Sequence, residues 1–132
     1  MSGVAVARHL LATNAALIAV VAPSKIKAGV VPINTTLPAI SIRQVSGIEY
    51  AVIRRGANEA VTDRIQITAL ALTYPQQKLI LNLARKALLG TRGTVNGFYV
   101  DSIVPDIEGP DFYNDDPVVY EQSIDYMIIF VR

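Results

Sequence analysis

The chain has 132 residues and no cysteine, with 52% hydrophobic and 17% charged residues. This length suits a single domain over residues 1–132, and the lack of cysteine excludes disulfides, thiolate nucleophiles and Cys-ligated metal sites. Average chains carry about 25% charged residues, so we expect part of the apolar surface to be buried against other subunits.

Charge is divided unevenly along the sequence. Residues 1–100 hold 11 Lys/Arg and 3 Asp/Glu, whereas residues 101–132 hold 1 Lys/Arg and 8 Asp/Glu. Such a split can steer a partner or self-association, or the two halves can neutralise each other within one fold. The basic excess also leaves a weak contact with DNA open, although the strong basic excess with interleaved aromatics that favours nucleic-acid binding is missing.

The first predicted element is a helix over residues 3–22, because apolar residues recur there at helical spacing and Pro23 ends the run. The run is about as long as a membrane span. Arg8, His9 and Asn14 lie within it, however, and charges inside a span are costly. A secretory signal would carry its charge before the apolar stretch. We therefore expect a buried amphipathic helix and no membrane association.

Short strands are predicted over residues 25–31 and 38–45, and Ser46-Gly47 marks a break after the second. Residues 47–60 are ambiguous and end in a turn-like segment. Residues 61–72 give the clearest strand, since apolar residues alternate along one face with Asp63 as the exception. The other face of this strand is polar early and apolar late. Such a strand is expected to be covered over only part of its length.

A second helix is predicted over residues 75–89, because Thr73 and Gln76 have capping-box spacing and Pro75 suits a first turn. Asn96-Gly97 is a hairpin signal leading into a strand over residues 98–103. Residues 105–117 read as an acidic loop before a final strand over 118–131, which again changes from one-sided to two-sided hydrophobicity. The order predicts an α+β fold, with an antiparallel-rich sheet and two main helices packed on one face as a single pair of layers.

A catalytic or metal site is not apparent in the sequence. His9 is the one histidine, and no local motif supplies a nucleophile and an orienting acid for it. The acidic loop offers oxygen ligands, but its spacing does not match a calcium-binding loop. Phosphate-binding glycine motifs do not occur. We therefore expect no enzyme, no catalytic or metal residues and no cofactor. Catalysis by carboxylates of the acidic loop is the weak alternative.

The order and hydrophobic pattern of four segments resemble the tail-completion, or tail-terminator, proteins of long-tailed bacteriophages and prophages. The segments are LPAISIRQVSG at 37–47, RIQITALALTY at 64–74, ARKALLGTRGTVNG at 84–97 and VYEQSIDYMIIF at 119–130. The likeness spans nearly the whole chain and rests on order and spacing. Segment 47–60 and the acidic loop match nothing in the family.

The resemblance implies a structural virion protein that forms a ring, a homo-oligomer and in this family a hexamer, at the head-proximal end of the tail. Its implied partners are further copies of itself, the tail-tube protein and a head connector or neck protein, with a passing contact with DNA in the lumen. It would assemble in the host cytoplasm and reside at the neck of the virion. The alternatives are a small binding or regulatory module and another head–tail connector component.

The charge split suggests where such a subunit meets its neighbour. The acidic loop holds Asp106, Glu108, Asp111, Asp115 and Asp116 and has no basic residue. We predict that it contacts a basic patch on the adjacent subunit or on a connector protein, with Arg54 and Arg55 as first candidates. The competing expectation is that the loop folds back on Lys78 or Arg85 of its own subunit.

Overall fold

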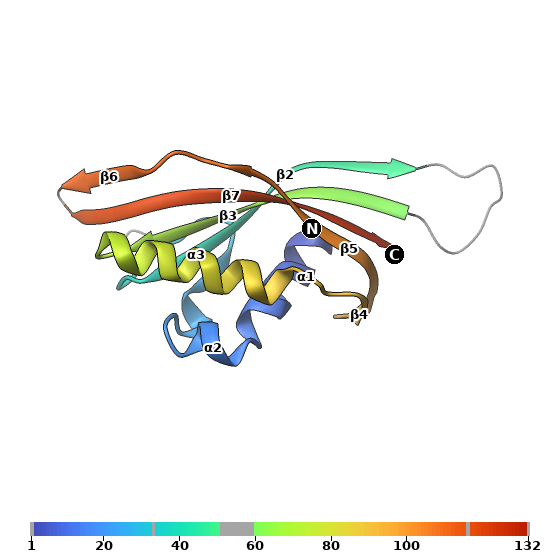
Figure 1. Ribbon diagram of the computed structural model, residues 1–132, viewed down its shortest axis with the longest axis horizontal. Coiled ribbons are helices and arrows are strands. Elements are labelled where there is room, and N and C mark those ends of the chain that lie inside the picture. Colours follow the sequence, from blue (N-terminus) through green and yellow to red (C-terminus); the bar gives the residue numbers. More distant parts are fainter. Residues whose placement is uncertain (1, 33, 51–59, 116, 132) are drawn as a thin grey trace.

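A curved sheet carries the architecture, and Figure 1 shows α1, α2 and α3 on the same side of it. The structure is a computed structural model that describes residues 2–32, 34–50, 60–115 and 117–131. The helices are α1 (Ser2–Ala12), α2 (Ala15–Ile18) and α3 (Tyr74–Leu88), with a 3-10 turn at Pro23–Lys25. The strands are β1 (Ile26–Ala28), β2 (Ala39–Tyr50), β3 (Ala60–Ala71), β4 (Gly93–Val95), β5 (Phe98–Glu108), β6 (Phe112–Asp115) and β7 (Val118–Val131).

The strand order is β1-β2-β3-β7-β5-β4, and β6 continues the line of β5 by pairing with β7. Every pairing is antiparallel except that of β1 with β2. β2, β3 and β7 are the long strands, and β3 pairs with β7 over its whole length. The predicted α+β class and the antiparallel-rich sheet are confirmed.

The core lies between the sheet and the helices, where alternating residues of the strands meet the apolar faces of α1 and α3. Its largest fully buried side chains include Leu11, Ile67, Ile80, Ile128 and Phe130. The capping prediction for the second helix is confirmed, because the Gln76 backbone N–H donates to Thr73 Oγ1 at 3.3 Å. This satisfies one of the N–H groups that a helix start leaves without an internal partner.

The predicted single helix over residues 3–22 is wrong. α1 ends at Ala12, and α2 begins at Ala15 after a break. Asn14 accounts for the break, because its side-chain oxygen accepts a hydrogen bond from the Leu17 N–H at 3.0 Å and caps the new helix. Asparagine competes with the helical backbone in this way and favours caps over helix interiors.

Three strand boundaries also differ from expectation. The first strand covers only Ile26–Ala28 of the predicted residues 25–31. β2 runs through Ser46 and Gly47, because a β-bulge between Gln44 and Ser46 absorbs the irregularity without ending the pairing with β3. The acidic stretch 105–117 is largely strand, since β5 continues to Glu108 and β6 follows after a short turn. The 14-residue strand β7 supplies the pairing partner for both.

Asp63, the polar exception on the buried face of β3, has a structural task. Its carboxylate is buried, with the residue 4% exposed, and Asp63 Oδ2 accepts a hydrogen bond from the Gly3 N–H at 3.0 Å. Gly3 lies in the first turn of α1, so a carboxylate from the sheet caps that helix where the helix dipole favours negative charge. A Cβ at Gly47 would lie 2.7 Å from Asp63 Oδ1, which leaves glycine as the residue that fits beside this carboxylate.

Candidate interaction surfaces

The face of the sheet opposite the helices has a polar centre built across β3, β7 and β5. Arg64 Nε donates to Asp125 Oδ2 at 3.0 Å, and its Nη2 also lies 3.0 Å from Asp106 Oδ2. Further along the same strands, the hydroxyl groups of Thr68 and Ser123 are 2.7 Å apart. Arginine can hold two carboxylates at once in this way because its planar guanidinium carries several donors.

The turn between β5 and β6 is held to the body of the protein by a polar cluster. Gln122 is buried, and its Nε2 donates to the Gly109 carbonyl at 2.8 Å. The Lys78 ammonium donates to Asp111 Oδ1 at 2.8 Å and also to Gln122 Oε1. Tyr74 donates its hydroxyl proton to Asp111 Oδ2 at 2.8 Å. The start of α3 and the acidic turn are thereby fixed to each other.

These contacts shift the pKa values of Lys78 and Asp111. Partial desolvation works to lower the pKa of Lys78, but hydrogen bonds to Asp111 and Tyr74 outweigh it and raise that pKa. The Lys78 ammonium, followed by the Tyr74 hydroxyl, lowers the pKa of Asp111. Both shifts favour the ion pair at neutral pH. Since the pair is largely exposed, its main effect is to position the turn.

β6 and the first turn of α3 lie at the same end of the molecule (Figure 1), and both carry aromatic residues. The ring centroids of Tyr113 and Tyr120 are 4.8 Å apart, and those of Tyr74 and Tyr120 are 6.3 Å apart. Phe112 and Tyr113 remain 60% and 56% exposed. Exposed aromatic residues of this kind are enriched in protein interfaces, where they bury a large area at low entropic cost.

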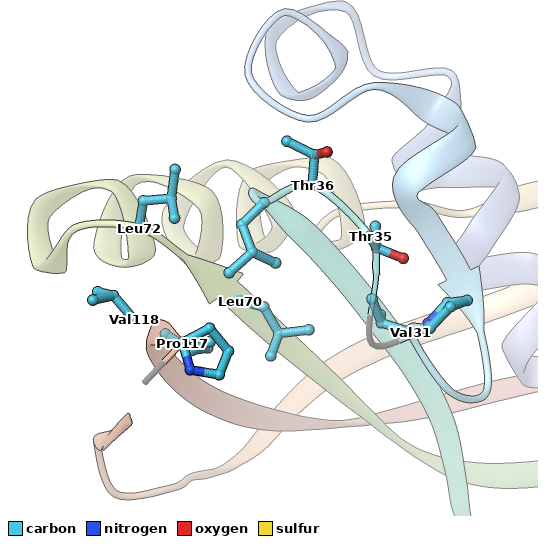
Figure 2. Close-up of a pocket in the computed structure, with 10 residues that line it drawn as sticks. Val31, Thr35, Thr36, Leu70, Leu72, Pro117 and Val118 are labelled. Atoms are coloured by element: carbon cyan, nitrogen blue, oxygen red, sulfur yellow. The ribbon is translucent and has the colours of Figure 1, made fainter. Parts of the chain in front are cut away.

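An apolar pocket of about 450 Å³ lies beside this end, between the ends of β3 and β7 and the loop after β1. Figure 2 shows Leu70, Leu72 and Val118 facing a space that Val31 and Thr35 bound from the loop. Leu70, near the end of β3, and Leu72, directly after it, belong to the late, apolar part of the strand predicted over residues 61–72. The loop covers this part incompletely, as expected for a strand that is buried on both faces over only part of its length.

The residues predicted for subunit contacts are distributed as follows. Arg54, Arg55 and Asp116 lie outside the described residues. Asp106 forms an ion pair with Arg64, and Asp111 forms one with Lys78. The pair with Lys78 agrees with the alternative prediction, in which the acidic stretch folds back on its own subunit.

Glu108 and Asp115 have only weak polar partners. Glu108 accepts a hydrogen bond from Gln122 Nε2 at 3.4 Å, and Asp115 accepts one from the Tyr113 hydroxyl at 3.1 Å. Arg85 lines a small pocket with Asp106 and Glu108 but forms no ion pair with them in the described structure.

The described part of the chain contains no group of three or more His, Asp or Glu residues that could hold a metal ion. His9 is exposed near the end of α1, where its backbone carbonyl accepts a hydrogen bond from the Thr13 hydroxyl at 2.7 Å. Burial raises the pKa of Tyr126 to about 12, so this phenol stays protonated at neutral pH. Among the described helices, none has the length and apolar character needed to cross a membrane.

The fold is similar to that of a solved virion chain. That chain comes from a structure described as the virion of a native gene transfer agent (GTA) particle. The similarity has a TM-score of 0.69 and covers 98% of this chain and 94% of the other, at 11% sequence identity. At this identity the likeness concerns the fold. No family model and no curated protein sequence matches the chain.

Proposed function

We propose that the chain is a structural component of a phage-like virion and has no catalytic role. The observation that carries this proposal is the similarity in fold to a gene transfer agent virion chain over almost the full length of both. The surfaces fit an assembly protein, because exposed aromatic residues and a partly covered apolar strand end lie side by side. These features suit subunit contacts better than they suit a reaction centre.

Within the virion, the proposed position is the head-proximal end of the tail. There the chain closes into a homo-oligomeric ring, a hexamer by analogy with the tail-completion family, which stops tail-tube growth and offers a joining surface to the head connector. The order of elements and the four segments between residues 37 and 130 support this placement. A ring needs two different contact surfaces on each subunit, and the uneven charge of the sequence suits such a pair.

The acidic residues remain the proposed contact points with a neighbour. Of the five, Glu108 and Asp115 are exposed and have no cationic partner among the described residues, so they are free to meet a basic surface. Arg54 and Arg55, at sequence positions between β2 and β3, are candidates on the adjacent subunit or its connector. Reversing both arginines to glutamate should weaken joining if they take part.

Removal of the gene from its phage or prophage tests the proposal. We expect tail tubes of uncontrolled length without attached heads, and we expect normal particles after the gene is supplied in trans. Tails of normal length joined to heads in the absence of the chain would refute the terminator role.

The apolar pocket favours a second candidate, a small binding module. Its lining is mainly aliphatic, and Thr35 and Thr36 supply the side-chain hydroxyl groups. A ligand site needs a few convergent polar groups on an apolar wall, and two threonines meet this requirement only in part. Saturable binding of an apolar small molecule, abolished by Leu70→Asp in a folded protein, would favour this candidate over the structural one.

A further inference from the structure

Three tyrosines from β6, β7 and the first turn of α3 form one cluster. The ring centroids of Tyr113 and Tyr120 are 4.8 Å apart, with the ring planes inclined by 42°. The rings of Tyr74 and Tyr120 meet edge to face at 6.3 Å. Tyr120 therefore contacts both other rings and covers one side of Tyr113. Because Tyr113 is still 56% exposed, the side of its ring that faces away from Tyr120 is open to solvent.

Asp115 lies beside this open ring. Residues two apart in a strand point to the same face, and the Tyr113 hydroxyl donates a hydrogen bond to Asp115 Oδ1 at 3.1 Å. Asp115 is exposed and forms no ion pair with another described residue. An open aromatic ring and an unpaired carboxylate are thus neighbours on β6.

The cluster already holds one cation of its own chain. The Lys78 ammonium lies over the Tyr74 ring, 4.9 Å from its centroid, and 2.8 Å from Asp111 Oδ1. The ring face and the carboxylate hold this cation together, since both attract positive charge. Tyr113 and Asp115 offer the same two groups, and no cation of the described residues lies between them.

The surroundings of this second pair favour a cation from another chain. β6 and β7 carry acidic residues, among them Asp115 and Glu121, and no lysine or arginine. Lys78, the cation that the cluster does hold, is engaged with Asp111 and Gln122. A negative surface of this kind is complementary to a basic one and repels an acidic one. The first 100 residues of a second copy, with 11 Lys/Arg and 3 Asp/Glu, supply basic groups.

Arginine suits this place better than lysine does. Its planar guanidinium stacks on an aromatic face and can donate two hydrogen bonds to one carboxylate. A lysine ammonium is a strongly hydrated point charge and lacks this fixed geometry. Among the described arginines, Arg43 and Arg85 are exposed and form no ion pair with another described residue.

We infer that an arginine of a second copy of the chain stacks on the open face of Tyr113 and donates to Asp115. This inference rests on the proposed ring and names one contact between its subunits. The donor and the tyrosine cluster belong to different parts of the chain, so the contact is heterologous, a type that can close into a ring. The candidate donors on the second copy are Arg43, Arg54, Arg55 and Arg85.

Changes at Tyr113 and Asp115 in the full chain test the contact. Tyr113→Phe keeps the aromatic face, so the concentration needed for half-assembly should change by less than about threefold. Tyr113→Leu keeps an apolar side chain but removes that face, and this concentration should rise about tenfold. Asp115→Asn removes the carboxylate charge and should act in the same direction. A requirement for the aromatic face separates cation binding from plain apolar burial.

Arginine-to-lysine changes identify the donor. Each of the four candidates is replaced by lysine in turn, which keeps the charge and removes the planar guanidinium. One of these changes should weaken assembly as much as Tyr113→Leu does. In the Tyr113→Leu background the same change should add little, since the two side chains act as one contact. Native mass spectrometry over a range of concentrations would measure each variant.

Tyr99 provides a matched control. It is also an exposed tyrosine, but it pairs with Val131 at the end of β7, whereas Tyr113 pairs with Tyr120 near the start. Tyr99 already has a cationic partner, Arg92 of its own chain. Tyr99→Leu should therefore leave assembly unchanged. An unchanged melting temperature of each variant would exclude loss of folding as the cause, and the lysine changes test the contact without altering the cluster.

Four results would overturn the inference. If Tyr113→Leu assembles as the unaltered chain does, the contact is wrong while the proposed ring stands. If Tyr113→Phe and Tyr113→Leu weaken assembly equally, the neighbour needs the hydroxyl group and no cation stacks there. If Tyr113→Leu weakens assembly and none of the lysine changes does, the cation does not come from an arginine of a second copy. If the unaltered chain forms no oligomer, alone or on tail tubes, the proposed ring itself fails.

Discussion

The capping of α1 by Asp63 gives the most quantitative test of the structure. Replacement of Asp63 by alanine removes the acceptor of the Gly3 N–H, a hydrogen bond of 3.0 Å in a buried position. Loss of a helix cap costs about 1 kcal/mol, and an N–H left buried without a partner costs about 1–3 kcal/mol. We therefore expect the free energy of unfolding to fall by about 2–3 kcal/mol for Asp63→Ala.

Thermal unfolding followed by circular dichroism measures this effect. For a domain of this size, each kcal/mol lowers the melting temperature by roughly 3–5 °C, so a fall of about 6–15 °C is expected. Asp63→Asn should cost less, because asparagine also caps helices. A loss below about 0.5 kcal/mol for Asp63→Ala, the range of ordinary surface changes, would refute the assigned role of this carboxylate.

A double-mutant cycle tests the packing beside the same carboxylate. Gly47→Ala places a Cβ 2.7 Å from Asp63 Oδ1 and 2.9 Å from Gln44 Nε2, so it should destabilise the protein. In the Asp63→Ala background the first of these contacts is gone, and the same change should cost less. Additive costs would mean that the two residues do not meet as described.

Four further predictions follow from single groups. The lowered pKa of Asp111 gives a stability contribution that is present above the ordinary aspartate pKa and is lost as the pH falls through the lowered pKa. Asp111→Asn should abolish this contribution. Urea unfolding at a series of acidic pH values would measure it. Tyrosines of the unfolded state have a pKa near 10, whereas the pKa of Tyr126 in the folded protein is about 12. The free energy of unfolding should therefore fall as the pH rises between these values. Tyr126→Phe should remove this pH dependence and also the tyrosinate absorbance that appears last in a pH titration. Gln77→Met should raise the free energy of unfolding by about 1 kcal/mol, because the amide of Gln77 is buried without a hydrogen-bond partner in the described structure. His9→Ala should leave assembly unchanged in a native gel or mass measurement, and a folded variant that no longer assembles would reveal a site at the end of α1.

The sequence predicted the regular parts of this fold, because their signals are local. The alternation of β3 and the Thr73 cap of α3 depend on residues close in the chain. The prediction of one helix over residues 3–22 was wrong for the same reason. The helical spacing of apolar residues dominated the local pattern, whereas the side chain of Asn14 ends the first helical segment and caps the second. The acidic stretch misled because its composition is typical of loops, whereas the long partner β7 imposes strand pairing on it.

The contacts of the acidic residues could be predicted only in part. The charge count alone predicts that the acidic stretch has basic partners, and Lys78 is one of the predicted candidates. Arg64 was missed as the partner of Asp106, because the bond depends on β7 lying between β3 and β5. Asp63 appeared as an exception in a buried face, a signal that a polar group must have a buried partner, but its partner lies 60 residues away.

The position of the chain in the particle tests the central claim most directly. Electron microscopy of virions carrying an epitope-tagged copy, labelled with gold-conjugated antibody, would locate it. We predict a label at the junction of head and tail in each intact particle. Particles that join heads to tails normally and carry no label there, while an untagged copy is absent, would contradict the account.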